Sequence, residues 1–172
     1  TNENSKNHLF YKYDKRLDFN KFDLSDLSLN IERVSNDTYL RANKLVSPLI
    51  DEFDLLESSL SMDLFSDELS INSKLLVYED LTKPENDRYE FILPKVDIIK
   101  KIENRTNLNG NFSFKSSNLV KNYQTNIFEK ININDFVFES SPYITNTGFY
   151  NDYNFIIKNV NSDSQNSEDY KD

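Results

Sequence analysis

The chain has 172 residues and a net charge of −9, and 37% of its residues are hydrophobic. That share is below the roughly 45–50% of ordinary globular proteins, yet 13 Phe and 10 Tyr are too many for a disordered chain. An acidic surface repels phosphate backbones, which disfavours nucleic-acid binding. With no cysteine, one histidine and two glycines, the chain is not expected to hold a disulfide, a thiolate or histidine-cluster metal site, or a glycine-rich phosphate loop.

Alternation of polar and apolar residues predicts four strands in the first half of the chain, at residues 8–18, 23–34, 54–65 and 69–79. Within them, residues 26–32 and 59–64 alternate strictly, as in a strand with one wet and one apolar face. A tight polar hairpin joins the third strand to the fourth, whereas 35–53 and 80–90 are longer connections of polar or mixed composition.

The second half is predicted to hold four more strands, at residues 91–102, 110–120, 124–139 and 147–160. Residues 111–115 alternate as strictly as the earlier segments, and 129–134 do so more loosely. Residues 161–172 have no apolar periodicity, so we expect a disordered polar tail or loop there. The predicted fold class is therefore all-β, an antiparallel meander of about eight long strands over residues 1–160.

Strand length points to a particular kind of sheet. Most of the predicted strands have ten residues or more, whereas ordinary strands average about 5–6 and a tilted membrane-spanning strand needs about 9–11. Short turns on one side and long loops on the other are typical of outer-membrane barrels. Because glycine is nearly absent from the strands, a gently curved wall of a wide transmembrane β-barrel is favoured over a small closed one.

The alternation assigns side chains to two faces. One face is predicted to hold ten hydrophobic residues: Leu27, Leu29, Ile31, Leu60, Met62, Leu64, Leu69, Ile71, Leu75 and Val77. The other is predicted to face a wet lumen with nine polar residues: Ser28, Asn30, Ser61, Asp63, Ser70, Asn72, Lys74, Ser113 and Lys115. Polar positions that recur at every second residue form a wetted wall, which differs from the focused pocket of an enzyme.

Candidate catalytic groups are sparse, and we predict no enzymatic activity, cofactor or metal. Neighbouring carboxylates occur at Asp23 and Asp26, at Asp51, Glu52 and Asp54, and at Glu79 and Asp80. With 29 acidic residues such pairs arise by chance, so a solvated loop or lumen face is the expected setting. Calcium loops need a central glycine that these segments lack. His8 is expected to be a polar residue at a strand end, because no serine or aspartate partner is spaced to activate it.

Aromatic residues lie near several predicted strand ends: Phe10, Tyr11, Tyr13, Tyr78, Tyr89, Tyr143, Phe149 and Tyr150. In a membrane barrel such residues form girdles at the two interfaces. The alternative is ordinary packing within a β-sheet core. Strand length favours the girdles, although the absence of Trp weakens the signal.

Five short segments, taken in chain order, carry a resemblance to a known protein family. Residues 31–41 read I-E-R-V-S-N-D-T-Y-L-R, and residues 54–60 read D-L-L-E-S-S-L. They are followed by Y-E-F-I-L-P-K-V-D at 89–97, N-G-N-F-S-F at 109–114 and N-T-G-F-Y-N-D at 146–152. In order and spacing over residues 8–160, these segments resemble the barrel domain of the LptD family of lipopolysaccharide-assembly proteins. The run S-N-D-T-Y-L-R carries most of the resemblance.

The resemblance implies a non-enzymatic role in lipopolysaccharide transport and assembly in the outer membrane of a Gram-negative bacterium. The expected partners are lipopolysaccharide, outer-membrane lipid, an LptE-type lipoprotein plug and the periplasmic Lpt bridge. Because the family begins with a signal peptide and a periplasmic jelly roll, this chain would be a middle piece of the barrel. Two alternatives stay open: another outer-membrane channel or receptor barrel, and a soluble acidic β-sandwich that binds a ligand or partner.

Overall fold

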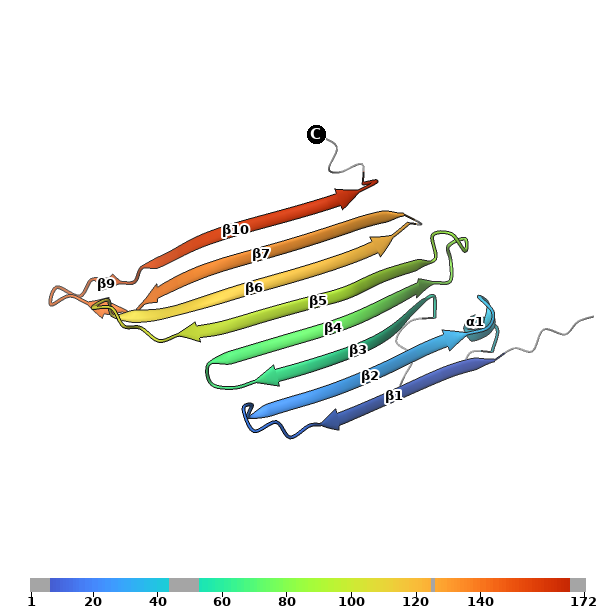
Figure 1. The fold of residues 1–172 in the computed structure, drawn as a ribbon, viewed down its shortest axis with the longest axis horizontal. Coiled ribbons are helices and arrows are strands. Elements are labelled where there is room, and N and C mark those ends of the chain that lie inside the picture. The colour runs from blue at the N-terminus through green and yellow to red at the C-terminus, as the bar shows by residue number, and fades with distance from the viewer. Residues whose placement is uncertain (1–6, 44–52, 125, 168–172) are drawn as a thin grey trace, which may run out of the picture.

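The computed structural model describes residues 7–43, 53–124 and 126–167, and most of them form a single antiparallel sheet (Figure 1). Its eight strands follow one another in chain order: β1 (His8–Arg16), β2 (Leu24–Val34), β3 (Leu55–Phe65), β4 (Leu69–Asp80), β5 (Tyr89–Ile102), β6 (Gly110–Tyr123), β7 (Ile127–Ser140) and β10 (Asn154–Gln165). The predicted all-β meander of long strands is confirmed. The sheet is not closed as a barrel, because β1 and β10 form its two edges and do not pair with each other.

Three short elements lie outside this sheet: helix α1 (Tyr39–Asn43) and the paired strands β8 (Tyr143–Ile144) and β9 (Tyr150–Asn151). The predicted last strand at 147–160 is therefore displaced. Residues 150–151 belong to the β8–β9 hairpin, and β10 runs on to Gln165, inside the segment expected to be a polar tail. Backbone hydrogen bonds with β7 hold this end, and such bonds require no apolar periodicity. Residues 168–172 lie outside the described residues.

The connections do not separate cleanly into short and long ends. At the α1 end of the sheet they span residues 35–54, 81–88 and 124–126, and at the opposite end 17–23, 66–68, 103–109 and 141–153. The expected asymmetry is therefore present only up to β5. It fails beyond because the short connection after β6 lies at the long-loop end, and the β8–β9 hairpin lies at the other.

A bulge in β5 explains how the sheet accommodates a proline. Lys74 of β4 pairs with Lys95, but Leu76 pairs with Ile92, so β5 holds one extra residue around Pro94. The β5–β6 register shifts at the same place. Proline has no backbone N–H to donate, and a bulge is one of the few sites where a strand interior tolerates it. Leu93 and Pro94 thus lie within β5.

Residues that pair directly across antiparallel strands point to the same face. By this criterion, all ten predicted hydrophobic residues, from Leu27 to Val77, lie on one face, which we call the apolar face. The opposite side is called the polar face. The separation weakens toward β10, where Asn132 and Asn134 lie on the apolar face and Ile131 and Ile133 lie on the polar face.

Within the part of the chain that the structure describes, a packed core forms only at the end of the sheet beside α1. There Val34, Leu40, Leu56 and Leu81 are buried together, with Phe10 and Tyr39 packed against them; Leu40, brought in by α1, is completely buried. The accessible surface of 12788 Å² exceeds the roughly 8800 Å² of a compact 20.3 kDa domain. No described helix is long and apolar enough to cross a membrane.

Candidate functional site

The nine predicted lumen residues, from Ser28 to Lys115, all lie on the polar face, distributed over β2, β3, β4 and β6. Ser28 pairs with Ser61, which pairs in turn with Lys74. Each strand contributes every second residue, so the sheet itself generates this polar surface. That it lines a lumen stays a prediction.

One row of the polar face concentrates carboxylates in a way that sequence spacing did not reveal. Paired residues cross six strands, from β1 to β6, in the order Arg16, Asp26, Asp63, Asn72, Asp97 and Ser117. Asn72 donates to the Asp63 carboxylate, and the Ser117 hydroxyl donates to Asp97 at 2.5 Å. Arg16 lies 3.4 Å from Asp26. The carboxylates are thus held by neighbours on adjacent strands.

Cations lie in the rows on either side of this one. In the row on one side, Lys74 pairs directly with Lys95. In the row on the other side, still on the polar face, Lys115 pairs with Asp135, which Lys158 contacts at 2.8 Å. Lysines therefore lie on both sides of the row that holds the carboxylates. Such a surface offers dispersed, exchangeable contacts to polar groups, and among the described residues no cluster of three metal-ligating side chains forms.

Four of the carboxylates expected in a solvated loop or on a lumen face have specific partners: Asp26, Asp54, Glu79 and Asp80. Asp26 belongs to the row just described, and Asp54 forms an ion pair with Arg41 of α1 that raises the Arg41 pKa. Asp80 accepts hydrogen bonds from the backbone and hydroxyl of Thr82. Glu79 accepts a hydrogen bond from Tyr89 at 3.1 Å. Asp51 and Glu52 lie outside the described residues.

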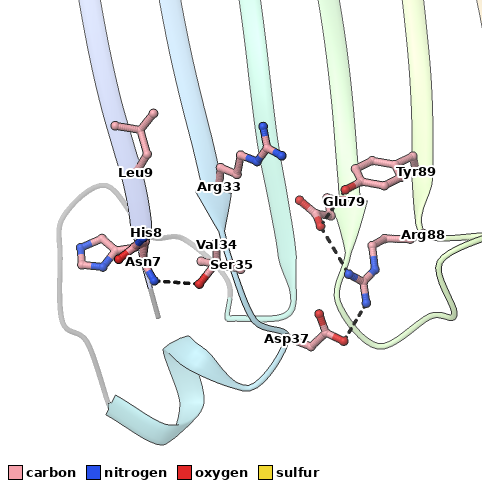
Figure 2. Close-up of a pocket in the computed structure, with 10 residues that line it drawn as sticks. All are labelled: Asn7, His8, Leu9, Arg33, Val34, Ser35, Asp37, Glu79, Arg88 and Tyr89. Atoms are coloured by element: carbon pink, nitrogen blue, oxygen red, sulfur yellow. Dashed lines mark hydrogen bonds and ion pairs between the residues drawn. The ribbon is translucent and has the colours of Figure 1, made fainter. Parts of the chain in front are cut away.

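A cavity of about 350 Å³ opens at the α1 end of the sheet, where β1, β2, β4 and β5 begin or end (Figure 2). Arg88 links two of its walls, reaching Asp37 at 2.7 Å and Glu79 at 3.7 Å. Asp37 and its neighbours raise the pKa of Arg88, which secures its positive charge. The Arg88 side chain is only 14% exposed, so this bridge ties the 81–88 connection to the 35–54 connection.

His8 lies at the rim of this cavity as a strand-end residue, as expected. Its Nδ1 is 2.9 Å from the Tyr39 hydroxyl, and its ring lies against Phe10. Nearby, the Asn7 backbone N–H donates to the Ser35 hydroxyl at 2.7 Å. These contacts fasten the start of β1 to the residues around α1. The cluster was not predicted from sequence, because Asp37 and Arg88 are 51 positions apart.

Seven of the eight aromatic residues expected near strand ends divide into two groups, and the eighth, Tyr13, lies within β1. Phe10, Tyr11, Tyr78 and Tyr89 lie at the α1 end, whereas Tyr143, Phe149 and Tyr150 lie in and around the β8–β9 hairpin at the opposite end. Phe149 is 70% exposed and Tyr11 is 46% exposed, so these two rings are not packed in a core. Phe10, by contrast, packs against the cluster at α1.

Comparisons of the chain with protein-family models, with curated proteins and with solved structures found no match. The resemblance to the LptD family therefore rests on the sequence motifs alone.

Proposed function

We propose that this chain is a wall segment of an outer-membrane-type β-barrel that handles lipopolysaccharide without any covalent step. In this proposal the apolar face meets membrane lipid, and the polar face borders a wet path for the sugar and phosphate groups of the cargo. The cargo, an LptE-type plug and a periplasmic Lpt bridge are proposed from the resemblance to the LptD family.

A single observation carries the barrel-wall proposal: an open, one-layer sheet of long strands with opposite polarity on its two faces over β2–β4. Leu60, Leu75 and eight other hydrophobic residues share the apolar face, while Ser61, Lys74 and their neighbours share the other. A soluble sandwich needs a second layer to cover the apolar face, and the described residues contain none. Exposure of this hydrophobic face to water is unfavourable, whereas contact with the hydrocarbon of a membrane is favourable.

Insertion is tested by diluting the urea-unfolded chain into buffer or onto phosphatidylcholine vesicles, followed by vesicle flotation and far-UV circular dichroism. We expect the chain to float with vesicles and to gain β-sheet signal there. A chain that stays behind as a folded, soluble monomer contradicts the proposal and favours the sandwich alternative.

The cargo is tested separately through the cations of the polar face. Lys74 and Lys95 pair side by side, and reversing both charges removes the nearest partners for lipid phosphates in that row. We expect the K74E/K95E variant in vesicles to bind lipopolysaccharide several-fold more weakly than the unchanged chain. Lys130→Glu on the apolar face is the matched control. Equal binding by all three proteins contradicts a lipopolysaccharide path on this face and favours another barrel function.

A further inference from the structure

The apolar face is not uniformly apolar along one row of paired residues. A complete row crosses all eight strands in the order Lys15, Leu27, Met62, Ser73, Val96, Asn118, Asn132 and Asn161. It is charged on β1, largely hydrophobic from β2 to β5, and made of asparagine on β6, β7 and β10. A hydrophobic zone that followed the rows would not change character in this way.

The hydrophobic residues instead form an oblique band. On β1 they are centred on Tyr11, four residues before the row at Lys15, and on β3 they are centred on Met62, in the row itself. On β10 they are Phe155 and Ile157, which precede Asn161 in the chain by six and four residues and so lie toward the end of the sheet opposite α1. The band continues there into exposed residues of the β8–β9 hairpin, such as Phe149.

The slope of this band can be compared with known barrel geometry. The shift is about nine residues at about 3.4 Å each, over seven strand spacings of about 4.8 Å, so the band is inclined by about 40° from the direction perpendicular to the strands. A band that lies in the membrane plane therefore tilts the strands by the same angle from the membrane normal. Strands of outer-membrane barrels tilt by about 35–45° from the membrane normal. The strand ends step in the same direction from β1 to β10 (Figure 1). The slope of the hydrophobic band therefore agrees in direction with the stagger of the strand ends.

A polar network occupies the apolar face where the band has moved away. Ser116 donates to Asn134 at 2.8 Å, and Asn118 donates to Ser116 at 3.1 Å. Asn134 donates to Asn132, which donates to Asn118, so the four side chains close a ring. Each asparagine still has a second N–H, which in hydrocarbon would lack the partner that water supplies. Lys130 and Asp163 follow on the same face.

We infer that the membrane plane crosses this sheet obliquely, with the strands tilted by about 40° from the membrane normal, and that hydrocarbon covers the oblique band alone. This inference rests on the proposed barrel function and adds to it a depth for each residue. The bilayer contacts β1 near α1 and β10 near the β8–β9 hairpin. Asn161, with the asparagine ring beside it, lies at the polar border, where headgroups and water satisfy its amide.

Because the chain has no cysteine, single-cysteine variants can test this depth map with one fluorescent label each. Met62→Cys and Asn161→Cys lie in the same row and on the same face, whereas Ile157→Cys lies in the band on β10. Ser61→Cys, next to Met62 on the polar face, is the matched control. Each labelled chain is reconstituted in phosphatidylcholine vesicles and quenched either by acyl-brominated lipid or by aqueous iodide.

We expect brominated lipid to quench the labels at Met62 and Ile157 several-fold more than those at Asn161 and Ser61, and iodide to show the reverse order. Equal lipid quenching at Met62 and Asn161 overturns the oblique crossing while leaving membrane insertion intact. Absence of lipid quenching at both Met62 and Ile157 overturns the barrel function itself. The two failures are therefore distinguishable.

Discussion

Ile71 and Asn72 are neighbours in β4 whose side chains lie on opposite faces of the sheet. Ile71 pairs with Leu64 and Ile98 on the apolar face, whereas Asn72 donates to Asp63 on the polar face. The same strand thus separates two environments at adjacent positions. This contrast makes the pair a sensitive test of which face meets lipid.

We predict that Ile71→Arg destabilises the membrane-inserted chain by about 2–4 kcal/mol, the penalty for a lipid-facing arginine near the bilayer centre. Asn72→Ala removes one hydrogen bond on the wet face, for which we expect about 1 kcal/mol. Urea unfolding in vesicles measures both, and surface display of lipopolysaccharide by the corresponding full-length variants gives the functional readout. A silent Ile71→Arg together with a disabling Asn72→Ala would mean that the faces are assigned the wrong way round.

Gly110 begins β6 at a point of close approach. A Cβ placed there would lie 2.4 Å from the Glu139 carbonyl oxygen and 2.7 Å from the Phe138 ring. The backbone oxygen belongs to the paired strand and cannot move aside without disturbing the β6–β7 register. Glycine is therefore required here by space.

Gly110→Ala is predicted to destabilise the sheet by about 1–3 kcal/mol, as overpacking does elsewhere. Asn111→Ala, the next residue and exposed, is the control and should change stability little. Unfolding free energies of the two variants in detergent provide the comparison. Equal values would show that the β6–β7 contact is looser than these distances indicate.

At the scale of elements, Arg88 fastens two connections to the end of the sheet. Its partner Glu79 is 12% exposed, and its partner Asp37 is 50% exposed. Removing Arg88 leaves the Glu79 carboxylate poorly solvated, with the Tyr89 hydroxyl as its remaining donor. Removing Asp37 leaves a site that water can fill, since the ion pair between Arg88 and Glu79 persists.

We therefore predict that Arg88→Ala costs about 1–3 kcal/mol and that Asp37→Ala costs about 0.2–1 kcal/mol. Hydrogen exchange should show faster opening of residues 35–38 in both variants. Arg105→Ala serves as the control, because its pair with Glu103 is exposed on both sides. If Arg88→Ala changes stability no more than this control, the bridge does not hold the two connections together.

The sequence predicted elements best where alternation was strong. The segments at 54–65 and 69–79 match β3 and β4 to within a residue, because apolar residues recur at every second position in runs such as 60–64 and face one side of the sheet. It failed for the end of β10, where Asn and Ser alternate with equally polar neighbours. Helix α1 also went unpredicted, since five residues are too few for a helical period. The Arg88 bridge depends on contacts between distant segments, which no local pattern encodes.

At the scale of the whole molecule, the sheet exposes much of its apolar face and two strand edges. Leu60 and Ile157 are 40% and 55% exposed on that face, and within the described residues β1 and β10 each lack a partner on one side. Unpaired edges recruit other strands, and large apolar patches associate in water. The small core beside α1 does not offset either tendency.

We predict that the isolated chain forms oligomers or aggregates in plain buffer and becomes monodisperse in detergent, because detergent covers the apolar face. Sedimentation velocity in the two solvents provides the measurement. A chain carrying Leu60→Lys and Ile71→Lys should remain small in buffer more readily, since the charges interrupt the centre of the apolar face. Asn72→Lys on the polar face adds charge without this effect and is the control. A monodisperse, cooperatively unfolding chain in plain buffer would contradict the open-wall structure and support a soluble module instead.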